Sequence, residues 1–485
     1  MKLKVKFLKI SAGRPVVIIN KKFAEKLSIH VDDRLRLLHG SKKIVSVVDI
    51  ASGFVAEGEI IVSTEIVHCL SLKEGDYVDL EISLKPDSIA LIHKKLTCQH
   101  LSRSELKEII QDIVDNALTE AEIAYFISGV YSCGMSMEEI VNLTKALIET
   151  GKTLELSGKT ADKHSIGGVP GRTTPIIVSI CAAAGIKIPK TSSRAITSPA
   201  GTADAMEVIC RVDFSIPEIK KIVKKIGACI VWGGSLNLAP ADDKIIQVEK
   251  LLNLDPEPQL LASIIAKKLS IGAKIILIDI PYGKNAKVTK KEAFELKRKF
   301  EAIGRHFKIK LKCSLKSVEE PLGDGVGPAL EIKDVIKVLK RESPCHLLES
   351  RSLELAGELL ELAGKVKKGK GYALAKEILE SKLAFKKFEQ IVKAQQGRLN
   401  SIGLAKYSSE IKSERNFTIK EIATQEINTI ARIAGCPLGK YAGIFIHKHV
   451  HDKVKKGEPL LIIYSENETE LKEAVKYYKK TKPVR

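Results

Sequence analysis

Long apolar runs are missing from this chain of 485 residues. No stretch approaches the roughly 20 consecutive apolar residues that a membrane-spanning helix requires. The first six residues alternate charged with apolar side chains, as a β-strand does, and they lack the apolar stretch of a signal peptide. We therefore expect a cytoplasmic protein, neither secreted nor embedded in a membrane.

Paired cysteines are missing too. The nine cysteines are scattered along the chain and form no C-x-x-C pair and no regular framework. Such a set is typical of reduced, mostly buried thiols and not of a disulfide scaffold or a zinc site. The sequence thus predicts neither disulfides nor a cysteine metal centre.

Aromatic side chains are few, since they make up only 5% of the chain. The net charge of +20, from 79 Lys and Arg against 59 Asp and Glu, favours an anionic partner, either nucleic acid or a small phosphorylated metabolite. Single-stranded nucleic acid is bound by stacking on aromatic residues, and the sequence has no cluster of aromatic and basic residues. We expect no nucleic-acid or membrane partner, and a basic RNA-binding protein remains a distant alternative.

The pattern of apolar and polar residues changes along the chain, and the length of the chain predicts about three domains. A β-rich N-terminal domain is predicted for residues 1–86 and a helical bundle domain, completed by later helices, for residues 87–160. An α/β domain is predicted for residues 161–405 and a C-terminal α+β domain for residues 406–485. The predicted fold class is therefore multi-domain α/β, with a mixed sheet in the central α/β domain.

Local patterns predict individual elements within these regions. Alternating apolar residues predict strands over residues 4–10, 15–19, 34–38, 43–50, 59–62 and 77–82. Capping boxes of the form S/T-x-x-E predict helices that begin at Ser102, Thr119, Ser136, Thr289 and Thr418, the last running to Ala434. Buried strands are predicted over residues 228–232 and 273–280, and two more strands over 444–446 and 459–464.

A glycine-rich segment, Asp162-Lys163-His164-Ser165-Ile166-Gly167-Gly168, runs on through Gly171 to Thr173. Its glycines let the backbone approach a ligand closely, and the N–H groups at the start of a following helix attract an anion. Lys163 adds a full charge, while Ser165 and Thr173 add hydroxyl donors. The spacing is not that of a Walker loop. The segment indicates a phosphate site, although such a turn can also be purely structural.

A second polar segment spans residues 189–204 and concentrates Ser and Thr hydroxyls, Arg194 and small residues. Such a donor surface suits a phosphate or a sugar phosphate. The alternative is a polar surface loop without a ligand. The two segments lie close together in the sequence, and this favours the phosphate interpretation.

These two segments carry a family resemblance. The pattern D-K-H-S-x-G-G-V, followed by S-x-R and then G-T-x-D, resembles the nucleoside phosphorylase family that includes the thymidine and pyrimidine-nucleoside phosphorylases. Residues 260–269 and 321–331 extend the similarity, which covers residues 95–480. The form T-S-S-R-A-I-T-S-P-A-G-T-A-D, together with the additional N-terminal domain, is similar to the archaeal-type AMP phosphorylase branch.

The resemblance assigns roles to individual residues. It implies that inorganic phosphate is bound by Lys163, Ser165, Ser192 and Thr202, and it gives His164 a catalytic role. It further implies a substrate site in which residues 193–198 hold a second, esterified phosphate. The substrate-binding residues that it implies are Gly167, Gly168, Ser193, Arg194, Ala195, Ile196, Thr197, Ser198, Thr202, Ser263, Lys267 and Lys287. Whether Gly167 or Gly168 contacts the substrate is left open.

Asp255, in the segment Leu254-Asp255-Pro256, resembles the proton donor of the AMP branch. A purine leaves more easily when it is protonated, so a carboxylic acid can act as general acid while phosphate attacks C1′. The alternative is a turn aspartate before proline. The base-contacting Arg of the pyrimidine enzymes is replaced by Val248, and this departure argues against a pyrimidine nucleoside.

Three histidines alternate in His447-x-His449-x-His451, which is a metal-like spacing on a strand. The segment opens a hairpin that resembles the C-terminal domain of the family. We therefore expect no metal at these histidines.

The resulting hypothesis is a pentosyltransferase that converts AMP and phosphate into adenine and ribose 1,5-bisphosphate. Phosphate is a co-substrate, and no cofactor is expected. A thymidine or pyrimidine nucleoside phosphorylase is the alternative enzyme, and the preference among bases stays open. The resemblance also implies a homo-oligomer, a dimer or larger.

Overall fold

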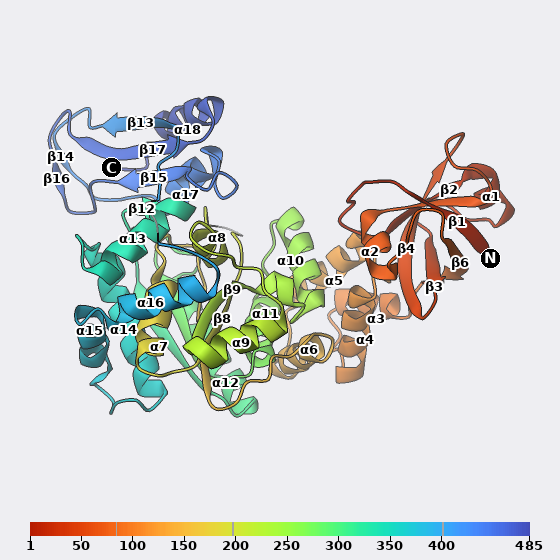
Figure 1. Cartoon of the computed structure of the whole chain (residues 1–485), viewed down its shortest axis with the longest axis horizontal. Helices are drawn as coiled ribbons and strands as arrows, with labels where there is room; N and C mark the ends of the chain where they lie inside the picture. Colours follow the sequence, from red (N-terminus) through yellow and green to blue (C-terminus); the bar gives the residue numbers. More distant parts are fainter. Residues whose placement is uncertain (84, 196–197, 400–401) are drawn as a thin grey trace. The chain divides into compact units, whose positions relative to one another are not determined.

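The computed structural model describes residues 1–83, 85–195, 198–399 and 402–485. Ile196 and Thr197, two of the residues assigned to the substrate, lie outside the described residues. Figure 1 shows the helices and strands of the chain in sequence colours. Contacts between residues divide the chain into two compact units. The first combines residues Met1–Gly151 with Ala239–Ala266, and the second combines Lys152–Leu238 with Lys267–Arg485.

A closed six-stranded barrel begins the first unit, with strand order β1-β5-β2-β4-β3-β6. The β1–β5 and β2–β4 pairs are parallel, and the other pairs are antiparallel. All six strands that the sequence predicts here are confirmed. The strands are β1 (Lys2–Phe7), β2 (Val16–Asn20), β3 (Arg34–His39), β4 (Lys42–Ala51), β5 (Glu59–Val62) and β6 (Tyr77–Ser83).

Two short helices, α1 (Lys21–Lys26) and α2 (Thr64–Leu70), complete the barrel and have no counterpart in the sequence-based expectation. Asn20 starts α1 because its side chain accepts hydrogen bonds from the N–H groups of Lys22 and Phe23. The barrel core is a cluster of buried apolar side chains that includes Val5 and Leu37, both fully buried.

Helices make up the rest of the first unit. The capping boxes at Ser102, Thr119 and Ser136 are confirmed, because each hydroxyl accepts from the N–H three residues on and each Glu side chain accepts in return. The helices are α3 (Ser88–Leu96), α4 (Arg103–Val114), α5 (Glu120–Cys133), α6 (Met137–Glu149) and α10 (Pro240–Leu252), and α11 (Glu257–Ser270) follows them.

A disulfide joins Cys98 to Cys133, and the expectation of reduced thiols throughout is wrong at this pair. The two residues are 35 positions apart in the sequence, but their Cα atoms lie 5.1 Å apart. They come together because α3 and α5 pack against each other and Cys98 follows closely after α3. The spacing of the two cysteines in the sequence does not predict this disulfide.

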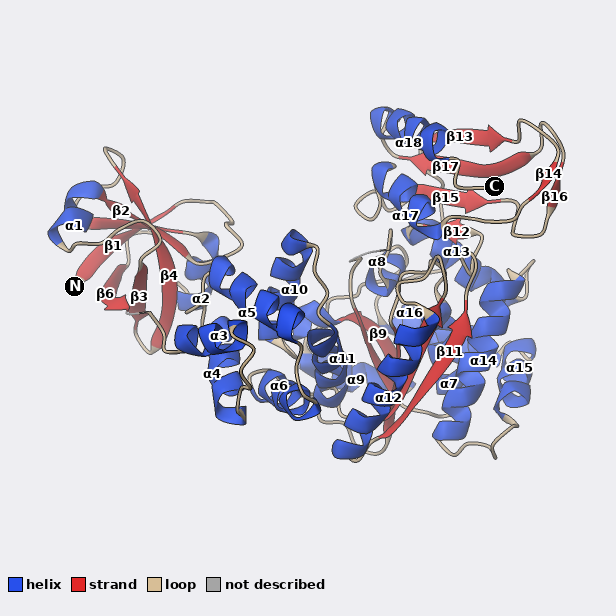
Figure 2. Cartoon of the chain, turned by 180° about the vertical axis from the view of Figure 1, so that it is seen from behind, coloured by secondary structure: helices blue, strands red, loops and turns tan. Residues whose placement is uncertain are grey.

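The α/β part of the second unit contains only parallel strand pairs among the described residues, where the sequence led us to expect a mixed sheet. The sheet β11-β10-β7 and the pair β8-β9 are each parallel. Helices α12 and α14 both contact β10 and β11, and Figure 2 shows them on the two sides of these strands. The strands are β7 (Thr160–Ser165), β8 (Ile188–Ser192), β9 (Ala228–Trp232), β10 (Ala273–Tyr282) and β11 (Lys310–Ser317).

The helices of this part include α7, which is buried around its whole circumference. It belongs to a large apolar cluster with α13, α14, α15 and α16. The capping box at Thr289 is confirmed as the start of α12. The helices are α7 (Thr173–Ala183), α8 (Thr202–Glu207), α9 (Ile216–Ile226), α12 (Lys290–His306), α13 (Pro328–Lys340), α14 (His346–Leu362), α15 (Gly371–Glu380) and α16 (Leu383–Ala394), with a 3₁₀ turn at Gly233–Leu236.

The last part of the second unit is an antiparallel sheet of order β12-β15-β17-β13 with a small pair β14-β16. The helix predicted to begin at Thr418 begins instead at Thr424, because Thr418 pairs with Lys453 as the last residue of β14. Glu421 forms ion pairs with Lys284 and Arg485 and does not close a capping box. The elements are β12 (Gly325–Val326), β13 (Tyr407–Lys412), β14 (Phe417–Thr418), α17 (Thr424–Ile433), β15 (Gly443–Ile446), β16 (Lys453–Val454), β17 (Pro459–Ser465) and α18 (Glu468–Thr481).

A search of the described residues for membrane-spanning helices finds none, because no helix is both long and apolar enough.

Candidate active site

The carboxyl end of β7 carries two residues that the resemblance assigns to phosphate. Lys163 is 1% exposed, and its Nζ donates to Thr173 Oγ1 at 3.1 Å, where α7 begins. Lys163 Nζ also lies 3.4 Å from Asp279 Oδ2 on β10, and Ser165 Oγ donates to the same oxygen at 3.1 Å. Burial lowers the pKa of Lys163, and the charge of Asp279 opposes that shift. The strand end therefore holds a buried cation beside two hydroxyls.

The glycine turn follows directly. Gly167 and Gly168 have φ values of +87° and +89°, a region that only glycine adopts easily. A Cβ on Gly168 would come within 3.0 Å of Lys287 Cβ, whereas a Cβ on Gly167 would meet open space. Asn428 on α17 donates to the Gly168 carbonyl at 3.3 Å. Gly168 is thus the glycine that brings the turn against Lys287.

A second buried group of charges is centred on Asp162, which is fully buried. Its Oδ2 lies 2.7 Å from Lys268 Nζ, and its Oδ1 lies 3.5 Å from Lys190 Nζ. Burial lowers the pKa of Lys190 to about 7, although the carboxylate raises it. The neighbouring His164 has its pKa held well below 6.5 by burial and by the charges of Lys268 and Lys190. The His164 imidazole is therefore neutral, and it can accept or donate a hydrogen bond without adding charge.

The second polar segment is closed by Asp204 at the start of α8. One carboxylate oxygen of Asp204 accepts from the N–H groups of Ala195 at 2.7 Å and Gly201 at 2.8 Å. Gly201 is required here, since a Cβ would meet the Ser193 carbonyl oxygen at 2.4 Å. Ala195 and Gly201 are therefore held to the same oxygen atom, and Thr202 is the first residue of α8.

Ser192, the last residue of β8, and Arg194, which follows it closely, have different surroundings. The Arg194 guanidinium forms ion pairs with Glu207 at 2.8 Å and Asp204 at 3.1 Å, and it lies over the Trp232 ring. Ser192 Oγ is buried and has no hydrogen-bond partner among the described residues. A buried hydroxyl costs free energy unless it is paired, so Ser192 is suited to a ligand oxygen. Arg194, in contrast, is held by protein carboxylates.

Arg172 and Glu331 connect the two loops. The Arg172 guanidinium pairs with Glu331 and also donates to the Ala200 carbonyl at 2.5 Å. Glu331 in turn accepts from the N–H groups of Gly171 at 3.3 Å and Gly327 at 3.1 Å. Because Glu331 is fully buried, this ion pair fixes the glycine turn relative to the loop before α8.

Asp255 and Ser263 belong to the first unit. Asp255 lies between α10 and α11, three residues after the end of α10. Ser263 on α11 donates to Asp242 Oδ2 at 2.8 Å, and Gln259 donates to Asp242 Oδ1 at 3.0 Å. Val248, which stands in place of the base-contacting Arg of the pyrimidine enzymes, is 4% exposed on α10. The other described residues assigned to phosphate or substrate, Lys267 and Lys287 included, belong to the second unit.

The alternating histidines do not lie together on a strand, because β15 ends at Ile446. His449 instead bridges two carboxylates, with Nδ1 at 3.0 Å from Glu320 and Nε2 at 3.1 Å from Asp324. These two hydrogen bonds raise the pKa of His449 to about 10. Within residues 1–83, 85–195, 198–399 and 402–485, no group of three or more His, Cys, Asp or Glu side chains is placed to hold a metal ion.

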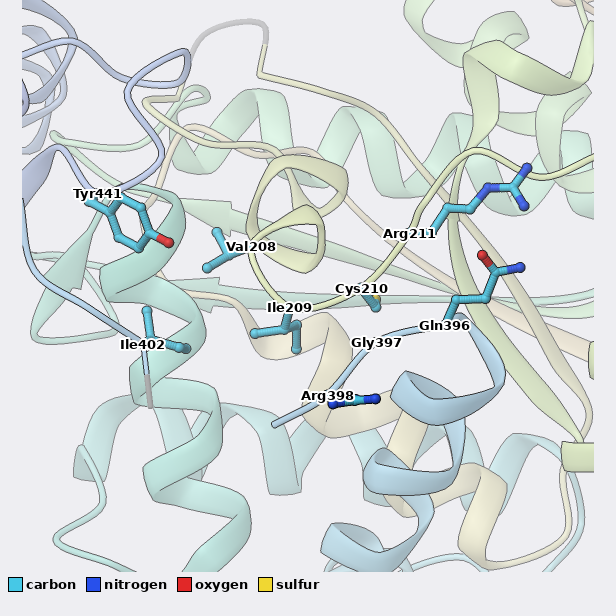
Figure 3. Close-up of a pocket in the computed structure, with 9 residues that line it drawn as sticks. All are labelled: Val208, Ile209, Cys210, Arg211, Gln396, Gly397, Arg398, Ile402 and Tyr441. Carbon is cyan, nitrogen blue, oxygen red and sulfur yellow. The ribbon is translucent and has the colours of Figure 1, made fainter. Parts of the chain in front are cut away.

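A cavity of about 420 Å³ lies elsewhere in the second unit (Figure 3). It is found past the end of α8, whereas Thr202 begins that helix. None of the assigned site residues lines it. Its lining residues are Val208, Ile209, Cys210, Arg211, Gln396, Gly397, Arg398, Ile402 and Tyr441.

Sequence reasoning missed the carboxylates that organise the site, namely Asp279, Asp204 and Glu331. A signal for Asp279 exists, since it is the single charged residue in the apolar run Ile275-Ile276-Leu277-Ile278-Asp279-Ile280. A carboxylate in such a strand is buried and needs a cationic partner. Lys163 and Asp279 are thus a pair that the pattern alone could have suggested.

Comparison with known families defines the class of this fold and site. The helical bundle domain of a glycosyl transferase family matches residues 89–151, and the a/b domain of that family matches residues 157–255. The C-terminal domain of pyrimidine nucleoside phosphorylase matches residues 418–484. Anthranilate phosphoribosyltransferase from Thermus thermophilus has a similar fold, with a TM-score of 0.53 at 17% identity, covering 63% of this chain and 99% of that chain. The class is that of transferases acting on glycosidic bonds.

Comparison with individual curated proteins identifies a family within this class of transferases. The AMP phosphorylase of Pyrococcus furiosus is 42% identical, over 100% of this chain and 98% of the relative. The AMP phosphorylase of Methanococcus vannielii is 42% identical over 99% and 97%, and that of Methanocaldococcus jannaschii is 41% identical over 100% and 97%. The chain belongs to the AMP phosphorylase family.

Proposed function

We propose that this protein is an AMP phosphorylase, which converts AMP and inorganic phosphate into adenine and ribose 1,5-bisphosphate. The observation that carries the proposal is the identity of 41–42% to AMP phosphorylases over essentially the whole chain. The buried cations at the end of β7 and the polar loop before α8 supply the chemistry that such a reaction needs.

The reaction joins a phosphate oxygen to C1′ of the ribose and breaks the bond from C1′ to the base nitrogen. Lys163, Ser165, Ser192 and Thr202 bind the attacking phosphate in this proposal. The electron pair of the broken bond goes to the base, and Asp255 donates the proton that the leaving purine takes up. Charge builds up on the ribose as in glycoside hydrolysis, and the phosphate dianion stabilises it. The neutral His164 contacts the sugar or base as a hydrogen-bonding group.

The esterified 5′-phosphate of AMP requires a second anion site. We assign it to the loop of residues 193–198 and to Lys287, which lies against Gly168. Asp204 holds the N–H groups of Ala195 and Gly201, which fixes the backbone at these two positions before a ligand binds. The 5′-phosphate then distinguishes a nucleotide from a nucleoside substrate.

The experiment that tests this proposal compares substrates that differ in one group. Purified protein and phosphate are incubated with AMP, CMP, UMP, adenosine or thymidine, and the free base is quantified by chromatography. We expect adenine from AMP and little or no base from adenosine or thymidine. Thymine from thymidine without adenine from AMP would establish a pyrimidine nucleoside phosphorylase instead.

A matched pair of variants locates the second anion site. Lys287→Met removes one cation beside Gly168, and Lys310→Met removes an exposed cation at the start of β11. The first variant is expected to raise the KM for AMP about tenfold, while the second changes it by less than about twofold. An equal effect of both would place the 5′-phosphate elsewhere.

A further inference from the structure

One buried carboxylate contacts both phosphate-assigned residues of β7. Asp279 lies opposite Ser165 in the parallel register of β10 and β7, and it is 4% exposed. Its Oδ2 accepts from Ser165 Oγ at 3.1 Å and lies 3.4 Å from Lys163 Nζ. The positions of the Ser165 hydroxyl and the Lys163 ammonium therefore depend on the same oxygen atom.

The other oxygen of this carboxylate is held by an arginine from a distant part of the sequence. Arg351 on α14 is 5% exposed, and its Nη2 lies 2.5 Å from Asp279 Oδ1 and 3.4 Å from the Ser314 carbonyl oxygen. Its Nη1 donates to Glu354 Oε2 at 3.0 Å. Arg351 thus fixes Asp279 through the oxygen that Lys163 and Ser165 do not use.

The charges of this group matter as much as its geometry. Lys163 and Asp279 alone sum to zero, and a neutral pair exerts little attraction on a phosphate dianion. Lys163, Asp279 and Arg351 together carry +1, and all three side chains are buried, so that salt screens them weakly. Glu354, which also pairs with Arg351, is more exposed and is itself paired with Lys316, so these two charges leave the sum unchanged. Asp279 also favours the protonated form of Lys163, since it raises the lysine pKa, which burial and the charges of Arg351 and Arg172 lower.

We propose that Asp279 and Arg351 are a positioning pair for the phosphate nucleophile, in which Asp279 orients Lys163 and Ser165 and Arg351 cancels the repulsion between Asp279 and phosphate. The proposal rests on the proposed function, because it takes Lys163 and Ser165 as the phosphate ligands. It goes beyond that function by adding two residues that do not touch substrate.

Three variants of the full chain test the pair by the KM for phosphate, the KM for AMP and the binding of phosphate alone by calorimetry. Arg351→Met lowers the charge of the group from +1 to 0, and we expect the KM for phosphate to rise at least about tenfold with the KM for AMP changed less than about twofold. The double variant Asp279→Asn with Arg351→Met restores a charge of +1 and is expected to recover part of that loss. An ion pair with no electrostatic role toward phosphate would leave the double variant no better than Arg351→Met.

Asp279→Asn alone supplies a readout that does not depend on whether Arg351→Met folds. Arg351 keeps Glu354 and the Ser314 carbonyl as partners in this variant. Without Asp279, Lys163 loses its proton at lower pH. We therefore expect the ratio of the variant to wild-type phosphate KM to rise at least about tenfold between about pH 6 and pH 9. Taking the ratio cancels the ionisation of phosphate itself.

Glu358→Gln is the matched control, because it removes an ion pair with Lys312 from the same helix without touching Asp279. The glutamine oxygen can still accept from Ser314 Oγ, as Glu358 does. Its phosphate KM and pH profile are expected to match the wild type. A flat pH ratio for Asp279→Asn, or variants of the pair indistinguishable from Glu358→Gln, would overturn the proposal. Should the wild type release no adenine from AMP, the proposed function fails, while calorimetry with phosphate alone still decides the role of the pair.

Discussion

The N-terminal barrel and the end of β7 use charged residues in opposite ways. In the barrel, a cluster of apolar side chains such as Val5 and Leu37 fills the interior, and ion pairs such as Lys6–Glu59 lie at the surface. Arg34 of β3 departs from this rule, since it is buried and paired with Glu122 of α5. Around β7, six charged side chains are buried in two groups, each with one carboxylate between two cations. The two regions thus differ in whether apolar or charged side chains are buried.

We attribute the apolar core of the barrel to stability and the buried charges around β7 to function. Burial of apolar side chains stabilises the barrel, whereas burial of charged side chains costs desolvation free energy even when the charges are paired. A protein keeps such charges where an anion must be bound and oriented. The group of Lys163, Asp279 and Arg351 carries a surplus of one positive charge, which suits a phosphate anion. The group around Asp162 carries the same surplus only when Lys190, whose pKa is lowered to about 7, is protonated. Substitutions in the two regions should therefore change different measured quantities.

The largest effect is expected from Lys163→Met. This variant removes the buried cation at the end of β7 and should lower kcat/KM for phosphorolysis by about 10²–10³-fold. Asp279 keeps Arg351 as a partner, so the variant should fold, as circular dichroism can check. The exposed Lys310→Met is the control. Activity within a few-fold of wild type would show that phosphate is bound elsewhere.

Leu37→Ala tests the barrel, and we expect it to lower stability without lowering activity. Leu37 is fully buried on β3, and its truncation is expected to cost about 2–5 kcal/mol of stability. The rate of phosphorolysis well below the melting temperature should not change. Ile82→Ala, at a side chain 55% exposed in the same barrel, should have little effect on either. A lower kcat without a lower unfolding temperature would give the barrel a part in the chemistry.

A pH-dependent contribution is expected from His449, which is partly buried and bridges Glu320 and Asp324. Because its folded-state pKa is raised to about 10, its stabilising effect is fully present below the unfolded value of about 6.5 and is lost as pH rises through 10. The difference in melting temperature between wild type and His449→Gln should therefore shrink from pH 7 to pH 10.5. The exposed His451→Gln should show no such trend, and a constant difference for His449→Gln would contradict the assignment.

The smallest effect is expected at the barrel surface. Lys6 and Glu59 are 2.7 Å apart, but the lysine side chain is 46% exposed. Lys6→Gln should therefore change the free energy of unfolding only slightly, and less at high salt than at low salt. Denaturant titration at two salt concentrations measures it. A loss comparable to that of Leu37→Ala would remove the contrast between the two regions.

Local patterns predicted much of the fold because their partners lie within a few residues. The boxes at Ser102, Thr119, Ser136 and Thr289 each close between residues three apart, and all four cap helices. The same pattern at Thr418 does not begin a helix, because both of its residues form long-range contacts instead. Thr418 pairs with β16, and Glu421 forms ion pairs with Lys284 and Arg485. Tertiary contacts thus override a capping signal of about 1 kcal/mol.

The site divides in the same way. Lys163, Ser165 and the glycine turn are contiguous, so their pattern indicates phosphate chemistry directly. Arg351 lies 72 residues beyond Asp279, and Cys98 lies 35 residues before Cys133. No local period relates such residues, because strand order and helix packing bring them together. The residues assigned to phosphate therefore form a pattern that the sequence shows directly, whereas the pairing of Arg351 with Asp279 and of Cys98 with Cys133 does not show in it.

The most direct test of the central claim is whether adenine release from AMP consumes inorganic phosphate. Protein and AMP are mixed with phosphate, with pyrophosphate or with neither, and both adenine and the phosphorylated ribose are quantified by chromatography and phosphorus NMR. The account predicts adenine only with phosphate, in equal amounts with a ribose that carries two phosphate groups. Release of adenine without phosphate, or with pyrophosphate in its place, would contradict it.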